Sequence, residues 1–287
     1  MQKSIRYIFL AAMAALLIFV LTSCIDPQAQ SSEGEKGGES SQATTVDILK
    51  IGKADAIIID TGSEIIMVDT GEAENFPTIE EYMRGNGYTK IDKLILTHYD
   101  KDHIGSATEI INSYGVEAVY ESRFTKSSNE YYSYHNAITD KGVQLFKLYS
   151  DLTFESGACK IEINVPRSNK YSNDNDNNRS LVVSVTIGEH GMLLLGDALD
   201  ARIDELLDGE LAHYNAVKLP HHGSYIENLS TLLAKIEPTY AIATDSKKNP
   251  TDERTKNELD SLGILLYKTS NGGVHVEITS DGVSIFQ

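Results

Sequence analysis

The chain has 287 residues, of which 41% are hydrophobic and 23% charged, and its formal net charge is −17. This length can bury a full core in one large domain or in two small ones. Nucleic acid is disfavoured as a partner, because binding a phosphate backbone usually depends on clustered basic residues that displace counterions.

The first residues have the pattern of an export signal. Lys3 and Arg6 precede an apolar run over Ile8–Leu21, which is shorter than the roughly 20 residues needed to cross a bilayer. The run leads into LTSC, which resembles the lipobox of bacterial lipoproteins. This resemblance implies cleavage before Cys24 and attachment of lipid to its sulfur. We therefore expect an exported protein tethered to the outer face of the cell membrane, with a plain signal peptide or membrane anchor as the alternative.

Residues 1–23 are accordingly predicted to be a lipoprotein signal peptide. Residues 24–45, rich in Ser, Gly, Glu and Gln, are predicted to be a flexible tether, and residues 46–287 the folded domain. Cys159 is the only other cysteine. Once Cys24 carries lipid, no intrachain disulfide is expected, so the exported fold must depend on its core and on metal.

Apolar patterning predicts strands and helices in alternation along the domain. Strands are predicted at 47–51, 54–60, 64–68, 93–97, 117–120, 181–187, 192–195, 216–219, 240–244, 274–279 and 283–286. Helices are predicted at 76–85, 106–114, 135–141, 201–207, 226–236 and 252–262. Helices in both halves of a mixed sheet indicate a layered α/β sandwich. Chemistry is then expected at strand ends, where loops gather side chains.

One strand end is unusually rich in ionisable groups. The stretch THYDKDHIG, residues 97–105, places His98, Asp100, Asp102 and His103 within six positions, directly after an apolar run. Such spacing on a turn lets alternate side chains converge on one point. Imidazole nitrogen and carboxylate oxygen are the usual ligands of hydrolytic divalent metals. The stretch therefore predicts a metal site, and a solvated acidic turn is the simpler alternative.

Three other apolar runs end in groups of the same kind. Asp69 follows IIMV, Asp197 follows LLLG, and the adjacent pair His221 and His222 follows VKLP. Each could cap a turn on its own. Because a buried charge without a partner is costly, the acids are predicted to meet at one cation cluster.

Together, THYDKDHIG, MVDTG, LLLGDA and LPHHGS resemble the ordered motifs of the metallo-β-lactamase superfamily of metal-dependent hydrolases. Asp100, the stretch NRSLV at residues 178–182 and HHGS are most similar to the hydrolase domain of bacterial competence DNA-uptake proteins and its stand-alone relatives. The resemblance covers roughly residues 46–287. It implies a four-layer αβ/βα sandwich with a metal site at one edge.

Carried over by position, the resemblance implies these metal ligands: His98, Asp100, Asp102, His103, Asp197 and His222. Asp197 would bridge two ions, and Asp102 would also accept a proton during attack. Either His221 or His222 could be the ligand; we favour His222 and place His221 near the reacting group. Asp69 would orient a ligand imidazole. The family's separate third histidine has no counterpart, so one or two divalent ions are expected, zinc first and manganese as the alternative.

These features predict a metal-dependent hydrolase in which metal-activated water attacks a small-molecule substrate, with a phosphodiester or other phosphoester slightly preferred. The insertion over residues 122–178 and the strand start that follows it supply these substrate-side candidates: Asn178, Ser180, Tyr131, Tyr132 and Tyr134. The tyrosines could cage a quaternary ammonium, although clustered tyrosines more often pack against a core. Two alternatives stay open: a catalytically degenerate, exported metal- or ligand-binding lipoprotein, and a β-lactamase or lactonase.

Overall fold

The computed structural model of the protein describes residues 43–171 and 176–287. The expected signal peptide, Cys24 and nearly all of the expected tether lie outside the described residues. All described residues belong to the compact unit that covers residues 40–287. The first strand begins at Thr44, two residues before the predicted start of the folded domain. In the described part of the chain, no helix combines the length and the apolar character needed to cross a membrane.

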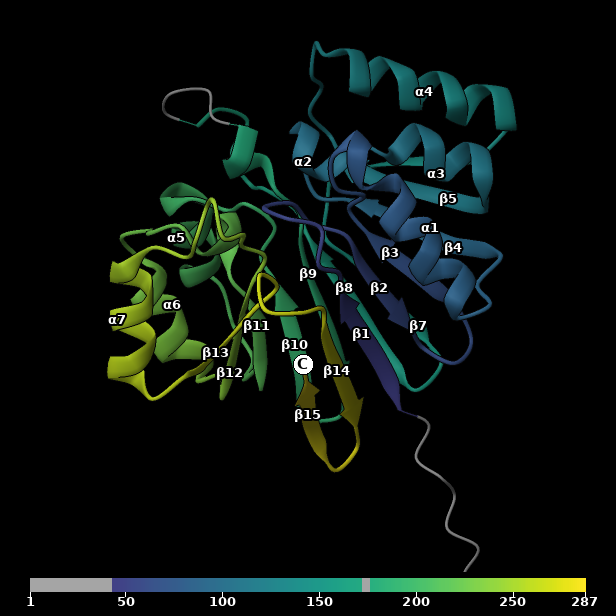
Figure 1. Cartoon of the computed structure of the whole chain (residues 1–287). Coiled ribbons are helices and arrows are strands. Elements are labelled where there is room, and N and C mark those ends of the chain that lie inside the picture. Colours follow the sequence, from purple (N-terminus) through teal and green to yellow (C-terminus); the bar gives the residue numbers. More distant parts are fainter. Residues whose placement is uncertain (1–42, 172–175) are drawn as a thin grey trace, which may run out of the picture. The chain divides into compact units, whose positions relative to one another are not determined.

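The first of two sheets has eight strands, in the order β15-β14-β1-β2-β3-β4-β5-β6 (Figure 1). Its strands in chain order are β1 (Thr44–Ile48), β2 (Ile57–Asp60), β3 (Ile65–Val68), β4 (Lys90–Leu96), β5 (Gly115–Ser122), β6 (Gln144–Leu148), β14 (Val274–Thr279) and β15 (Gly282–Phe286). Neighbours from β3 to β6 run parallel, and the other pairs are antiparallel.

The second sheet has seven strands, in the order β13-β12-β11-β10-β9-β8-β7. Its strands are β7 (Leu152–Ser156), β8 (Cys159–Asn164), β9 (Val182–Ile187), β10 (His190–Leu194), β11 (Ala216–Lys218), β12 (Tyr240–Ala243) and β13 (Leu265–Lys268). Neighbours from β10 to β13 run parallel, whereas β7 to β10 form an antiparallel meander.

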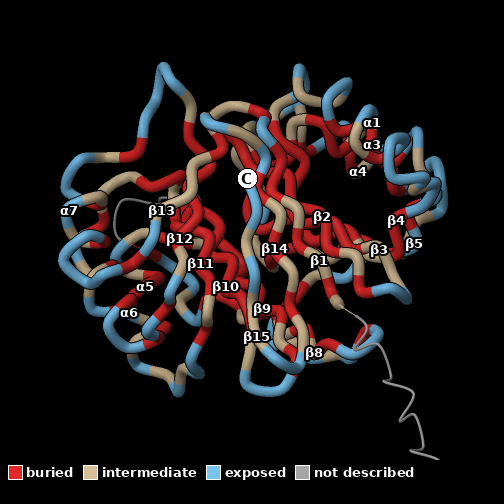
Figure 2. Tube along the Cα trace, turned by 60° about the horizontal axis from the view of Figure 1, so that its bottom comes forward, coloured by how far each residue is buried: buried red, intermediate tan, exposed pale blue. Residues whose placement is uncertain are grey.

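The core between the two sheets follows from alternation along the strands. Val46 and Ile48 on β1 and Ile161 and Ile163 on β8 are buried, and their neighbours are half-exposed. Successive side chains point to opposite faces of a strand, so one face of each sheet meets the other sheet. These residues share a single apolar cluster with residues of β9, β10 and β14. Figure 2 shows the same division, with buried strands and exposed outer surfaces of the helices.

Helices cover the outer face of each sheet (Figure 1). Those on the first sheet are η1 (Ala73–Asn75), α1 (Phe76–Gly85), α2 (Lys101–Ile104), α3 (Ala107–Ser113) and α4 (Asn129–Lys141). Those on the second sheet are α5 (Asp200–Leu207), α6 (Leu229–Ile236) and α7 (Glu253–Leu262). The short 3-10 helices η3 (Asp176–Arg179) and η4 (Pro220–Gly223) precede strand β9 and follow strand β11. The predicted four-layer αβ/βα sandwich is confirmed.

The region 122–178 belongs mainly to the fold itself. It contains α4 and three strands, β6, β7 and β8, that the sequence analysis did not predict. The helix predicted at 135–141 begins six residues earlier, at Asn129, because the Ser128 side chain accepts a hydrogen bond from the Tyr131 N–H and caps the helix. Residues 172–175 of this region lie outside the described residues.

Candidate metal centre

The predicted site residues lie in loops at the carboxyl ends of parallel strands. Asp69 follows β3 and the stretch 97–103 follows β4, and these two strands are parallel neighbours. Asp197 follows β10 and His222 follows β11, which are also parallel neighbours. Carboxyl ends of adjacent parallel strands meet at the same sheet edge, so each sheet delivers its polar residues to one place.

The backbone of these loops is constrained. Asp69, His221 and His222 have positive φ values of 58°, 47° and 57°. Residues other than glycine rarely adopt this conformation, which costs about 1–3 kcal/mol and is concentrated at functional sites. Gly196 also has a positive φ, 53°, and an added Cβ there would lie 3.1 Å from the Cβ of Ser180. The turn that carries Asp197 therefore leaves no room for a larger residue.

Four donor groups face one another across the two sheets. His103 Nε2 is 3.2 Å from Asp197 Oδ1, and His222 Nε2 is 3.3 Å from Asp197 Oδ2 and 3.4 Å from Asp102 Oδ2. Ligands about 2.0 Å from a tetrahedral metal ion stand about 3.3 Å apart. The separations match that spacing.

The donors also lack other partners. Among the described residues, the Nε2 atoms of His103 and His222 and the Oδ1 atom of Asp197 are buried without a hydrogen bond. Buried polar atoms are normally satisfied, whereas these three have ion-pair contacts with one another and with Asp102 in place of hydrogen bonds. A divalent cation fits all three. The arrangement therefore suits a metal ion, and the ligand assignment itself stays a prediction.

Hydrogen bonds on the far side of each imidazole hold its Nε2 atom inward. Asp69 Oδ2 is 2.7 Å from His103 Nδ1, and Asp69 also accepts hydrogen bonds from the backbone N–H and the hydroxyl of Thr97. Thr244 Oγ1 lies 2.9 Å from His222 Nδ1 and donates a hydrogen bond to Asp55. Such partners fix the tautomer and the orientation of a ligand imidazole.

His98 and Asp100 lie beside this cluster. The ring centroids of His98 and His103 are 4.2 Å apart, and His98 Nε2, 3.7 Å from Asp100 Oδ2, has no hydrogen-bond partner in the described structure. Asp100 forms an ion pair with Lys126, which also pairs with Asp176 at 3.0 Å. The predicted ligands His98 and Asp100 therefore lie close together, but Lys126 engages the Asp100 carboxylate.

Charge is strongly coupled within the cluster. Burial alone would raise the pKa of Asp197, yet the facing imidazoles of His103 and His222 hold it well below its usual range. Burial alone would lower the pKa of His222, but Asp197 and Asp55 raise it to about 9. Burial would also lower the pKa of His103, but the carboxylates of Asp197 and Asp69 raise it well above its usual value. In the metal-free protein both imidazoles are therefore positively charged at neutral pH, with a proton on each ring nitrogen. A metal ion would displace the Nε2 protons.

Asp55 and Lys218 belong to the site but were missed in the sequence. Asp55 lies in the loop between β1 and β2, and Lys218 is the last residue of β11; the two are buried and form an ion pair. Asp55 Oδ1 is 3.3 Å from His222 Nδ1. The available signals were an aspartate among alanines before an apolar strand, in KADAIIID, and a lysine inside the apolar run AVKL.

Asp55, His103, Asp197 and His222 offer atoms within 4.8 Å of one another, which would suit a four-ligand metal site. Asp55, however, lies on the Nδ1 side of both imidazoles, and its oxygens contact Lys218 and the Thr244 hydroxyl. The unsatisfied Nε2 atoms face Asp197 and Asp102 instead. We therefore place Asp102, rather than Asp55, as the fourth donor.

The structure brings His222, not His221, to the carboxylates. His221 is partly exposed, its ring centroid is 6.2 Å from that of His222, and its backbone N–H donates a hydrogen bond to the Gly196 carbonyl. Burial lowers the pKa of His221, so its imidazole is neutral at pH 7. His135 lies on α4 with its Nε2 atom 3.1 Å from Glu121, and His190 begins β10, at the end of that strand away from Asp197.

The prediction that Asn178 and Ser180 contact substrate needs correction. Both are buried, and their side chains bond within the protein. Ser180 Oγ donates to the Asn177 carbonyl and accepts from the backbone N–H of Asp197, 3.2 Å away. Asn178 Oδ1 accepts from the backbone N–H of Arg202. The two residues therefore support the turn that presents Asp197.

The proposed tyrosine cage is also wrong for Tyr131 and Tyr134, which are buried on the inner side of α4. The Tyr134 hydroxyl donates a hydrogen bond to Glu121 Oε2, and the Tyr131 ring packs edge-on against Tyr99, 4.9 Å between centroids. Tyr132 is 55% exposed, and its ring lies edge-on to that of Tyr131, with 5.9 Å between the centroids. The packing alternative is therefore correct, because the helical period places the two tyrosines on the core face.

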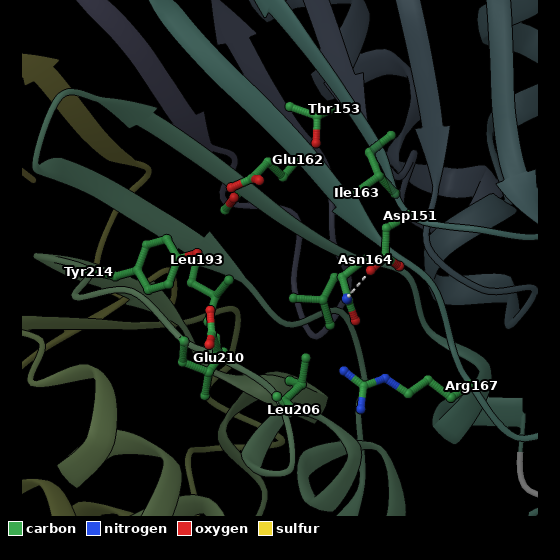
Figure 3. Close-up of a pocket in the computed structure, with 14 residues that line it drawn as sticks. Asp151, Thr153, Glu162, Ile163, Asn164, Arg167, Leu193, Leu206, Glu210 and Tyr214 are labelled. Carbon is green, nitrogen blue, oxygen red and sulfur yellow. Dashed lines mark hydrogen bonds between the residues drawn. The ribbon is translucent and has the colours of Figure 1, made fainter.

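Asp102 lies between two surface pockets. One, of about 380 Å³, is lined by Tyr99, Asp100, Lys101, Asp102, Lys126, Ser128 and Glu130. The other, of about 490 Å³, is lined by Asp102 together with residues of three loops that include Lys53, Glu72 and Lys248. A third pocket, of about 210 Å³, lies on the outer face of the second sheet beside α5 (Figure 3), and no candidate metal ligand lines it.

A model of the metallo-beta-lactamase superfamily matches residues 50–243, and the chain belongs to this superfamily. Recombination protein 2 of Haemophilus influenzae is 28% identical over 214 residues, which are 71% of this chain and 24% of that protein. Competence protein ComA of Neisseria gonorrhoeae is 26% identical over 238 residues, 79% of this chain and 31% of that protein. The chain thus spans about a quarter to a third of the length of these curated relatives.

Among solved structures, the metallo-beta-lactamase fold protein YhfI from Bacillus subtilis superposes with a TM-score of 0.57 at 11% identity. The match covers 82% of this chain and 99% of that one. The resemblance to the superfamily and to competence proteins is therefore confirmed, and the structural match supports the fold alone.

Proposed function

We propose that the protein is a metal-dependent hydrolase with a phosphoester substrate, acting through the cradle of Asp102, His103, Asp197 and His222. The proposal rests on the buried, unsatisfied atoms His103 Nε2, His222 Nε2 and Asp197 Oδ1. The nitrogen–oxygen distances between these imidazoles and the carboxylates of Asp197 and Asp102 are 3.2–3.4 Å, as between ligands of one ion. Zinc fits the nitrogen and oxygen donors, and manganese is the alternative.

A divalent cation in this cradle would lower the pKa of a bound water from about 15.7 towards about 7 and polarise the substrate oxygen. The residues of the chain do the rest. Asp69 and Thr244 keep the Nε2 atoms of His103 and His222 inward. Burial would raise the pKa of the Asp102 carboxylate, but the facing imidazoles of His222 and His103 outweigh it and lower that pKa, and the side chain is 21% exposed. It therefore stays ionised and can accept a proton from attacking water.

Charge around Asp102 favours an anionic substrate. Lys101 and Lys126 line one of its two pockets together with Asp100 and Glu130. Lys126 is already paired with Asp100 and Asp176, whereas Lys101 is exposed and makes only a 3.7 Å contact with Glu72, so Lys101 is the more available ammonium. An ammonium group offers three donors to phosphate oxygens. This supports a phosphoester over a neutral ester, in a small molecule rather than a nucleic acid, since the chain as a whole is acidic.

The test uses the full chain purified in detergent and supplied with Mn²⁺ or Zn²⁺. We expect turnover of bis(p-nitrophenyl) phosphate that requires the metal and falls at least about 100-fold in Asp197→Ala, with loss of bound metal in elemental analysis. Asp140→Ala, on the exposed side of α4, is the matched control. Unchanged metal content in both Asp197→Ala and His98→Ala would contradict the assigned ligands.

A binding protein with a degenerate hydrolase fold is the second candidate, because Lys126 engages Asp100 and no third histidine joins His98 in the described structure. Tight metal binding without turnover of phosphoesters, carboxylic esters or lactams would favour it. Hydrolysis of nitrocefin in preference to phosphoesters would instead favour a β-lactamase.

We also propose that the protein is exported and held at the outer face of the cell membrane by lipid on Cys24. The basic residues, apolar run and LTSC of residues 3–24 support this proposal. A tether of some twenty polar residues would then place the metal centre a short distance from the lipid surface.

A further inference from the structure

Asp55 and Lys218 form a buried ion pair beside the candidate metal centre. The side chains of Asp55 and Lys218 are each 1% exposed. Asp55 comes from the first sheet and Lys218 from the second, so the pair joins the two halves of the site. Burying two charges carries a desolvation penalty that their attraction often fails to repay, so such a pair is weak evidence for a stabilising role alone.

Asp55 lies beside the imidazole of His222, one of the four residues of the cradle. Its Oδ1 atom accepts a hydrogen bond from the Thr244 hydroxyl, at 2.6 Å, and the same hydroxyl lies 2.9 Å from His222 Nδ1. Its other oxygen pairs with Lys218. The Asp55 carboxylate therefore lies between the Nδ1 side of His222 and the Lys218 ammonium group.

Lys218 is poised beside the carboxylate that would bind metal. Its Nζ atom donates a hydrogen bond to the Gly196 carbonyl, at 3.0 Å, and lies 3.9 Å from Asp197 Oδ1. That oxygen is one of the atoms left unsatisfied in the described structure. A shift of about 1 Å would bring the ammonium into full hydrogen-bonding contact with it. Lys218 could then neutralise the carboxylate that the metal ion needs.

We propose that Asp55 is a positioning residue for the metal centre, which holds the Lys218 ammonium away from Asp197 and supports His222 through Thr244. The proposal rests on the proposed metal site. Without the Asp55 charge, the Lys218 ammonium moves into contact with the Asp197 carboxylate. It then forms an ion pair there that competes with metal binding. Asp55 thus keeps the Asp197 carboxylate available for a metal ion, although it would bind no metal itself.

Isothermal titration of the metal-free full chain in detergent, with Mn²⁺ and separately Zn²⁺, tests this inference independently of any hydrolysis. Asp55→Asn keeps an oxygen for the Thr244 hydroxyl but removes the charge that holds Lys218. We expect it to weaken metal binding about 100-fold, the upper range for residues that support ligands. Asp92→Asn is the matched control, since Asp92 is a buried partner of Lys90 at the opposite end of β4.

The double variant Asp55→Asn/Lys218→Met separates competition from ordinary structural damage. It replaces the buried pair by neutral groups, which proteins often tolerate. We expect metal affinity to return to within about tenfold of the wild type, a rescue that loss of ligand support alone would not give. A double variant as weak as Asp55→Asn, or an Asp55→Asn variant that binds like the wild type, would overturn the inference.

Lys218→Met provides a second route if Asp55→Asn fails to fold. It removes only the competing ammonium, so we expect metal binding at least as tight as in the wild type. Binding weakened tenfold or more would show that Lys218 supports the site and would overturn the inference. A wild-type protein that binds neither ion would overturn the proposed function as well, whereas a wild type that binds while all variants match it refutes only the role of Asp55.

Discussion

The metal-free protein should lose stability as the pH rises from 6.5 to 9.5. Asp197 and Asp55 raise the folded pKa of His222 to about 9, against burial, whereas an unperturbed histidine has a pKa of about 6.5. A group whose pKa is raised on folding contributes stability that is fully present below its unfolded pKa and is lost as pH rises through its folded pKa. A difference of some 2.5 units at 1.36 kcal/mol each gives a loss of about 3 kcal/mol. His103 shifts in the same direction and adds to the loss.

Urea unfolding of the EDTA-treated protein at pH 6.5 and pH 9.5 measures this difference. The chain has no tryptophan, so far-UV circular dichroism is the suitable signal. His222→Gln is the control, because it removes this titration and should shrink the pH-dependent loss. In the metal-loaded protein the imidazoles bind as neutral ligands, so stability should instead rise with pH over this range. Equal stability of the metal-free wild type at both pH values, or an undiminished loss in His222→Gln, would refute the assigned coupling.

Two further outcomes are expected. Arg202→Met should lower the free energy of unfolding by about 3 kcal/mol. The reason is that the fully buried guanidinium donates hydrogen bonds to the carbonyls of Ser180 and Asn164, which would lose their partner. Urea unfolding measures this cost, and a cost as small as that of Arg84→Met, at an exposed position, would contradict the reasoning. Cys24→Ala should move most of the protein from the membrane fraction to the soluble fraction of a bacterial host, as followed by immunoblotting, and an unchanged distribution relative to Cys159→Ala would rule out the lipid anchor.

The strand ends that carry the candidate ligands could be predicted because each has a signal within its own stretch of sequence. A short apolar run that ends abruptly in charged residues, as at 94–103, marks both a strand and the loop after it. The same logic predicted α1 with the bounds that the structure has, since its amphipathic run ends at Gly85. Order along the chain and the layered class followed from these segments.

Contacts between distant segments could not be predicted in the same way. Asp55 reaches Lys218 only because the loop after β1 and the end of β11 meet, and nothing near either residue in the sequence specifies the other. Strands β6, β7 and β8 were missed because their outer faces carry exposed residues, as in LTFES, so their apolar content is low. The tyrosines of α4 were ambiguous because helix bounds decide which of them face the core.

The candidate ligands are divided between the two sheets: Asp102 and His103 lie in α2, after β4 of the first sheet, and Asp197 and His222 follow β10 and β11 of the second. Thr244, which fixes one of the rings, lies still further along the chain. During synthesis, nearly the whole polypeptide must therefore have left the ribosome before any ion-binding geometry exists. A prematurely terminated product that ends before β11 would lack His222 and would be inert.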